Sequence, residues 1–200
     1  LPRSYPFVMW YTLIKQPKEG AMRTFCTEGP VDPKENYTVP RTALVAEGLK
    51  KVEQWRYFTI FAPRQSGKTT YFQMLIEEMN HTNPELIPVW ISFEAYGGKT
   101  EKEFLHSFTR DMNVYFLSRD IPISIQPLDS IERFKDECFR IRRETEKDLV
   151  LIVDEIEGLR SETTLNLFLH TVRNIYHIKK EYGLRSVILT GVSNITGILQ

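Results

Sequence analysis

The stretch Ala62-Pro63-Arg64-Gln65-Ser66-Gly67-Lys68-Thr69 has the residue pattern of a phosphate-binding loop. The β-branched and aromatic segment 57–61 before it predicts a buried strand, and the segment from Thr70 to Met79 after it predicts a helix. A loop in this position turns its backbone N–H groups and the helix N-terminus toward an anion. We therefore expect residues 62–70 to hold the phosphates of a nucleotide. In this pattern Lys68 reaches the β- and γ-phosphates, and the Thr69 hydroxyl binds Mg²⁺.

A second motif supports the first, in which Ala62 replaces the usual glycine. The apolar run 149–153 predicts a central parallel strand that is buried on both faces. Asp154 and Glu155 follow it, at the end of the strand where open α/β sheets bind ligands. This is the Walker B pattern, in which Asp154 supports Mg²⁺ and Glu155 orients and deprotonates the attacking water. The pair of carboxylates favours an ATPase over a kinase or a GTPase.

The composition fits one globular domain and excludes several classes of site. The 200 residues are 42% apolar, and 26 basic side chains balance 26 acidic ones. A neutral net charge argues against a nucleic-acid partner, although a local basic patch stays open. Cys26 and Cys138 lie far apart and the four histidines have no ligand spacing, so we expect neither a disulfide framework nor a zinc site. No segment has the pattern of a membrane span or of a signal peptide, so the expected compartment is the cytoplasm.

The rest of the chain alternates predicted strands and helices, which indicates an α/β fold around a parallel sheet. Residues 1–35, punctuated by prolines, are expected to be an extended lead-in to a domain over 36–200. Capping-box patterns at Thr100/Glu103 and at Asp129/Glu132 predict the starts of two helices. The other expected elements are strands at 86–93 and 186–191, a loop at 95–98, a helix at 42–55, and a helix at 162–182 that buries Leu165, Leu169, Val172, Ile175 and Tyr176.

Thr190 stands at the end of the strand predicted to follow the Walker B strand. Its hydroxyl is a candidate catalytic group, because it could bond the attacking water or the γ-phosphate. It could equally do no more than cap the next turn. Ser193 and Asn194 are nearby alternatives for the same role, and the sequence does not separate them.

With both motifs placed, the chain resembles the AAA-like ATP-binding domains of bacteria, close to the STAND and origin-recognition-like branches of the AAA+ class. The resemblance covers the chain from about Thr24 onward and rests on segments 29–31, 37–41, 62–69, 151–156 and 188–192. It implies a three-layer P-loop NTPase fold with a central parallel sheet in the order 5-1-4-3-2. It also implies adenine-side contacts from Val39, Pro40 and Arg41, and it gives Thr190 the position known as sensor 1.

The chain stops at Gln200, so the fifth strand and the helical lid of the resembled class are expected to be missing from it. The resemblance also implies an arginine finger from another copy or a partner protein, and spacing does not choose among Arg160, Arg173 and Arg185. The expected function is Mg²⁺-dependent ATP binding with slow hydrolysis, acting as a conformational switch. Two other hypotheses stay open: a nucleic-acid-associated ATPase such as a loader or mobile-element helper, and a nucleotide-binding module without turnover. The intact Glu155 argues against the second.

Overall fold

Four parallel strands form the central sheet of the domain, which we describe from a computed structural model covering residues 39, 41–63 and 65–192. The strands are β1 (Phe58–Phe61), β2 (Leu86–Ser92), β3 (Asp148–Asp154) and β4 (Leu184–Gly191), and they lie in the order β1-β4-β3-β2. The parallel sheet and this order of four strands confirm the expected fold class. The fifth strand is not among the described residues, and the predicted lead-in 1–35 also lies outside them.

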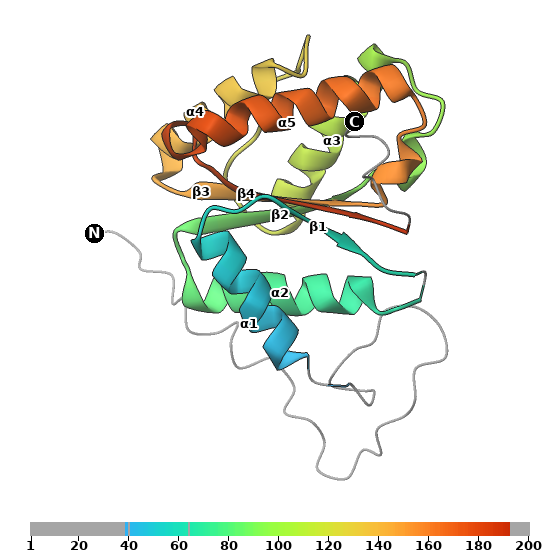
Figure 1. Ribbon diagram of the computed structural model, residues 1–200. Helices are drawn as coiled ribbons and strands as arrows, with labels where there is room; N and C mark the ends of the chain where they lie inside the picture. The colour runs from blue at the N-terminus through green and yellow to red at the C-terminus, as the bar shows by residue number, and fades with distance from the viewer. Residues whose placement is uncertain (1–38, 40, 64, 193–200) are drawn as a thin grey trace, which may run out of the picture. The chain divides into compact units, whose positions relative to one another are not determined.

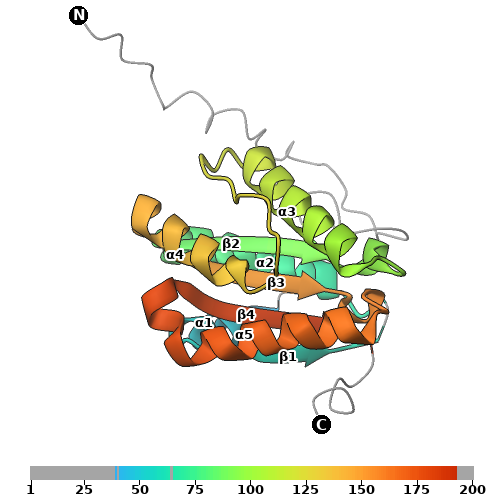
Figure 2. The same ribbon diagram turned by 90° about the horizontal axis from the view of Figure 1, so that it is seen from above.

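Helices cover both faces of the sheet, which gives the expected three layers (Figure 1). One face carries α1 (Thr42–Glu53) and α2 (Lys68–Thr82). The other carries α3 (Glu101–Ser118), α4 (Arg133–Thr145) and α5 (Glu162–Tyr182), which Figure 2 shows lying over the strands. Two short 3-10 helices, η2 (Glu94–Tyr96) and η3 (Ile156–Gly158), follow β2 and β3 directly. The predicted loop 95–98 therefore begins with a helical turn.

The strand β3 carries the core on both of its faces. All seven of its residues are buried, as its continuous apolar run predicts. Its side chains alternate: Leu149, Leu151 and Val153 join the cluster under α3–α5, whereas Val150 and Ile152 join the cluster under α1 and α2. This double burial fixes the register of β3, and so fixes where Asp154 emerges from the sheet.

Two helix starts were predicted from capping boxes, and only the first is confirmed. At α3 the Glu103 N–H donates to the Thr100 hydroxyl, and the Thr100 N–H donates to the Glu103 carboxylate. The prediction at Asp129/Glu132 is wrong, because α4 begins at Arg133 with no side-chain cap. The chain first makes tight turns over 130–135, in which each N–H bonds the carbonyl three residues back, and Ile131 enters the core from the turn.

The predicted bounds of α5 are confirmed, but its inward face is narrower than expected. Leu165, Leu169, Val172 and Ile175 are buried, whereas Tyr176 is 41% exposed. The Tyr176 ring packs edge-on against Tyr57 at the margin of the core, so only part of it is covered. Its outer face receives the Lys179 ammonium, 3.4 Å from the ring centroid.

Candidate functional site

The predicted phosphate loop joins the end of β1 to the start of α2. The helix begins at Lys68, so Lys68, Thr69 and Thr70 form its first turn. Gly67 is the N-cap residue, with φ 79°, and no side chain caps the helix. The first turn contains no acidic residue. The N–H groups at the start of a 15-residue helix are therefore free of a capping side chain and available to an anion.

Two cationic side chains lie across this loop. The Lys68 ammonium donates to the Ala62 carbonyl over 3.1 Å, and the Arg41 guanidinium donates to the Ser66 carbonyl over 2.8 Å. Arg41 also covers Gly67 so closely that a Cβ there would lie 2.4 Å from Nη2. The φ angle therefore favours glycine at residue 67, and the Arg41 guanidinium occupies the space beside it. Arg41 thus lies against the phosphate loop, and its adenine-side contact stays a prediction.

One hydroxyl in the loop has no hydrogen-bond partner among the described residues. The Ser66 Oγ is buried and unpaired there, and such groups in native proteins usually have a partner. Gln65 precedes it with a left-handed backbone, φ 60°. Pro63 and Gln65 are exposed. The predicted site residues Pro40 and Arg64 lie outside the described residues.

The Walker B residues and Thr190 meet on neighbouring strands. The Asp154 Oδ1 accepts hydrogen bonds from the Thr190 hydroxyl over 2.7 Å and from the Glu155 N–H over 3.0 Å. Thr190 is fully buried, and it pairs in register with Ile60 on β1, the strand that leads into the loop. The Thr190 side chain therefore bonds the Asp154 carboxylate, the predicted metal ligand. Ser193 and Asn194 lie outside the described residues.

Glu155 turns the chain sharply out of β3. Its backbone is left-handed, with φ 50° and ψ 50°, a conformation that side-chain-bearing residues seldom adopt. The η3 helix that follows packs tightly on the end of β2: a Cβ at Gly158 would lie 2.2 Å from the Phe93 carbonyl oxygen. This contact holds the turn in place, and with it the position of Glu155.

The three candidate arginine fingers differ in their surroundings. The Arg185 guanidinium donates to the Val52 and Glu53 carbonyls and to Asp148, and it lies 4.4 Å from the Trp55 ring. These contacts fix it at the beginning of β4. The phosphate loop lies at the opposite end of the sheet, where the strands finish. Arg160 and Arg173 are exposed. Arg185 is therefore engaged within its own domain, and its contacts favour Arg160 and Arg173 as the candidates.

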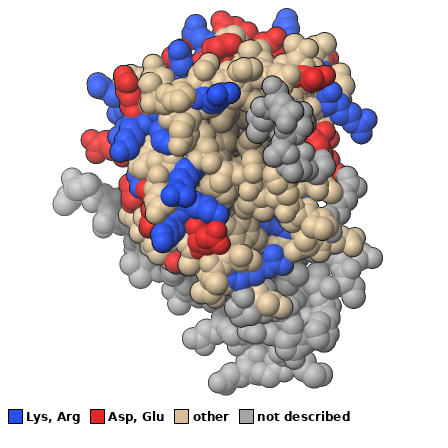
Figure 3. Space-filling view, in the orientation of Figure 1, with Lys and Arg blue, Asp and Glu red and all other residues tan. Residues whose placement is uncertain are grey.

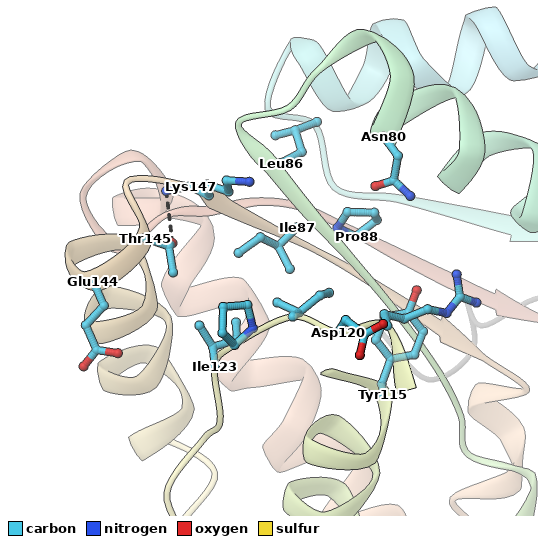
Figure 4. A pocket seen from close by; sticks show the side chains of 13 residues that line it. Asn80, Leu86, Ile87, Pro88, Tyr115, Asp120, Ile123, Glu144, Thr145 and Lys147 are labelled. Carbon is cyan, nitrogen blue, oxygen red and sulfur yellow. Dashed lines mark hydrogen bonds between the residues drawn. The ribbon is translucent and has the colours of Figure 1, made fainter. Parts of the chain in front are cut away.

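Two cavities lie beside the two outer strands of the described sheet, β1 and β2. A groove of about 410 Å³ runs between α1 and β1 and reaches the phosphate loop at Ser66 and Lys68. The larger cavity, about 640 Å³, lies beside β2, between the start of that strand and the C-terminal ends of α3 and α4 (Figure 4). Leu86 and Lys147 belong to its lining. Only the first cavity is continuous with the predicted site.

The donor set at the site suits Mg²⁺. The Thr69 hydroxyl and the Asp154 carboxylate are hard oxygen ligands, and Mg²⁺ is commonly held by one or two such groups together with phosphate oxygens and water. Within the described part of the chain, no group of three or more His, Cys, Asp or Glu side chains could hold a metal ion without a substrate. No helix there is long and apolar enough to cross a membrane.

A sequence model of the family described as "AAA domain" matches residues 53–199. The chain belongs to this AAA family. Similar solved structures include the ORC2 protein of Aeropyrum pernix in ADPNP-ADP complexes, with 14% identity, a TM-score of 0.46, and coverage of 80% of this chain and 44% of that one. PCH-2 of C. elegans has 15% identity, a TM-score of 0.43, and coverage of 77% and 37%. The AAA domain described here thus spans less than half of either structure. None of the curated proteins gives a significant match.

Proposed function

We propose that this AAA domain binds ATP with Mg²⁺ at the phosphate loop, hydrolyses it slowly, and acts as a conformational switch. The observation that carries the proposal is the buried bond of 2.7 Å between Thr190 and Asp154. It joins the ends of β4 and β3, and β4 lies next to β1, the strand that enters the loop. The three segments that an ATPase needs are therefore neighbours at one edge of the sheet.

Each side chain has a role that follows from its place. Lys68, at the start of α2, would move from the Ala62 carbonyl to the β- and γ-phosphates, and the Thr69 hydroxyl would face the metal. Asp154 would hold the metal through water, and Mg²⁺, when bound, neutralises charge on the phosphate oxygens. Glu155 would take the proton of the attacking water, and Thr190 would help to place that water.

The nucleoside would lie on the side of the loop where Arg41 bonds Ser66. The groove between α1 and β1 begins there, and its volume lies within the range of nucleotide-sized ligand sites. A guanidinium this close to the loop suits an anionic ligand, because Arg pairs with phosphate through several donors. We propose that Arg41 exchanges its bond to the loop carbonyl for one to the nucleotide.

Slow turnover is proposed because the transition-state cation would come from another molecule. Arg185, the arginine nearest to Thr190 in sequence, is held at the opposite edge by its contacts with α1 and Asp148. Arg160 and Arg173 are exposed, and so are available to a neighbouring copy. An arginine supplied in this way raises turnover by orders of magnitude.

The face of the domain shown in Figure 3 does not favour nucleic acid as the partner. On the face shown in Figure 3, basic and acidic side chains are interspersed around a largely uncharged centre. Binding to a phosphate backbone would need basic residues gathered on one face. Together with the neutral net charge, this places the switch first and the nucleic-acid-associated ATPase second.

The experiment is phosphate release from MgATP by the whole chain, with binding of a fluorescent ATP analogue measured beside it. We expect turnover that stops with EDTA. We expect Lys68→Ala to lose both binding and turnover, and Glu155→Gln to keep binding while turnover falls by about a hundredfold or more. Lys180→Ala and Glu181→Gln, exposed positions on α5, are the matched controls. A wild-type chain without turnover, or a Glu155→Gln variant with normal turnover, would refute the proposal.

A further inference from the structure

Glu157 is an acidic side chain near the site that the catalytic scheme above does not use. It lies in η3, two residues beyond Glu155. Its Oε1 accepts a hydrogen bond of 2.9 Å from the Val192 N–H, just after β4 ends. Its Oε2 is buried without a hydrogen-bond partner among the described residues. A carboxylate enclosed in this way needs a reason, because burying an unpaired charged oxygen is unfavourable.

The Glu157 carboxylate fits into space that exists because residue 191 is glycine. A Cβ at Gly191 would lie 2.5 Å from Oε2, well inside van der Waals contact. The next nearest atoms, at 3.4 Å, leave room for a methyl group. The Glu157 carboxylate therefore occupies the space that a side chain at residue 191 would take.

The residues that Glu157 touches are bonded in turn to the nucleotide site. The Gly191 carbonyl accepts the N–H of Ala62, the first residue of the phosphate loop, over 3.3 Å. Thr190, the next residue toward the N-terminus, bonds Asp154. The contact of Glu157 with residues 191 and 192 thus closes a ring between the turn after β3 and the end of β4, which Thr190 joins back to Asp154, and the Gly191 carbonyl links this ring to the phosphate loop.

We propose that Glu157 is a positioning residue of the hydrolytic site. Resting on the proposed ATPase function, it holds the end of β4 so that the Thr190 hydroxyl stays on Asp154, and it passes changes at the phosphate loop to the chain at Val192. Its effect is on turnover, because it contacts Gly191 and Val192 at the end of β4 and makes no hydrogen bond to the described residues of the loop. Glu157 thereby regulates the site through the position of β4 and takes no direct part in the chemical step.

The test is a double-mutant cycle of Glu157→Ala and Gly191→Ala in the whole chain. We expect each single change to lower kcat by roughly tenfold or more and to leave the dissociation constant of the ATP analogue within about twofold. The Gly191→Ala change displaces only the tip of a flexible side chain, so the domain should stay folded. The double variant should be no slower than Glu157→Ala alone, since the added methyl then meets no carboxylate.

Two further variants separate positioning from general damage. Glu157→Gln keeps an acceptor for the Val192 N–H and should be at least about fivefold faster than Glu157→Ala. Gly97→Ala is the matched glycine control on the same sheet edge, where a Cβ would make ordinary contacts at 3.5 Å or more. Unchanged kcat in both single variants, or effects that multiply in the double variant, would overturn the proposal.

A measurement that does not need turnover keeps this inference apart from the proposed function. Amide hydrogen exchange at Val192 should be faster in Glu157→Ala than in the wild type, and close to wild type in Glu157→Gln. A wild-type chain that releases no phosphate refutes the proposed function, and the inference is then decided by exchange. Equal exchange at Val192 in wild type and Glu157→Ala would overturn it, whatever the ATPase result.

Discussion

Replacing Thr190 with Val tests the buried bond on which the proposed function depends. Val keeps the shape of Thr but removes the hydroxyl, so Asp154 Oδ1 retains only the bond from the Glu155 N–H. A hydrogen bond to a charged group contributes about 1.5–3 kcal/mol. Since each 1.36 kcal/mol is a factor of ten, we expect kcat to fall by up to about 10–150-fold, the full loss applying if the Thr190 hydroxyl stabilises the transition state and not the ATP-bound ground state.

The same loss appears in stability, and Thr190→Ser is the control. For a domain of this size, losing about 1.5–3 kcal/mol lowers Tm by about 3–12 °C. Ser keeps the hydroxyl and loses one buried methyl, which costs about 1 kcal/mol of stability, and it should keep most of the activity. The assays are phosphate release and thermal unfolding followed by circular dichroism. Thr190→Val with the kcat and Tm of the wild type would refute the reasoning, as would Thr190→Ser as slow as Thr190→Val.

Three further predictions concern other parts of the domain. Gly158→Ala should lower the free energy of unfolding by about 2 kcal/mol or more in urea, because its Cβ would meet the backbone carbonyl of Phe93 at 2.2 Å; a loss below 0.5 kcal/mol would contradict this packing. Arg185→Ala should lower the free energy of unfolding by about 3 kcal/mol, since it leaves a buried carboxylate with one partner fewer, yet change phosphate release per folded molecule little; a selective loss of turnover would return Arg185 to the catalytic candidates. Hydrogen bonds from Thr100 lower the pKa of Glu103 from its ordinary value of 4.5, so the wild type should be more stable than Glu103→Gln above that pH and lose the advantage as the pH falls through the lowered pKa. Urea unfolding of both proteins between pH 3 and 7 checks the direction, and an advantage that persists at the lowest pH would contradict it.

Local sequence patterns predicted the loop, strand and helix positions around the site well. The loop motif, the apolar run of β3 and the cap of α3 each depend on neighbouring residues, and the structure has these elements where the patterns put them. Glu157 was missed because its partner Val192 is 35 positions away, and only the strand order brings them together. Tyr176 was misplaced for a similar reason, since helical spacing does not show where the covering layer ends.

The place of Arg185 in the fold can be predicted from the sequence. In a parallel sheet all strands begin at one edge, and the ligand lies at the other. Arg185 is the second residue of the strand that ends in Thr190 and Gly191. Its position at the start of the strand therefore already predicts that Arg185 lies at the end of the sheet away from the phosphate loop. Arg160 and Arg173 carry no such signal, because loops and helix surfaces are not tied to strand direction.

The order of the strands has a consequence for how the protein is made. Among the described residues β1 pairs with β4 alone, and Phe58 lies opposite Ile188, 130 positions later in the chain. At about 5–20 residues per second, a ribosome needs about 6–26 s to supply that partner. During this time β1, which leads into the phosphate loop, lacks its partner strand β4, and the Asp154 carboxylate lacks the hydrogen bond from Thr190. A nascent chain therefore completes the proposed nucleotide site only after β4 emerges, and the pairing of β1 with β4 is slow to form because it closes a long loop.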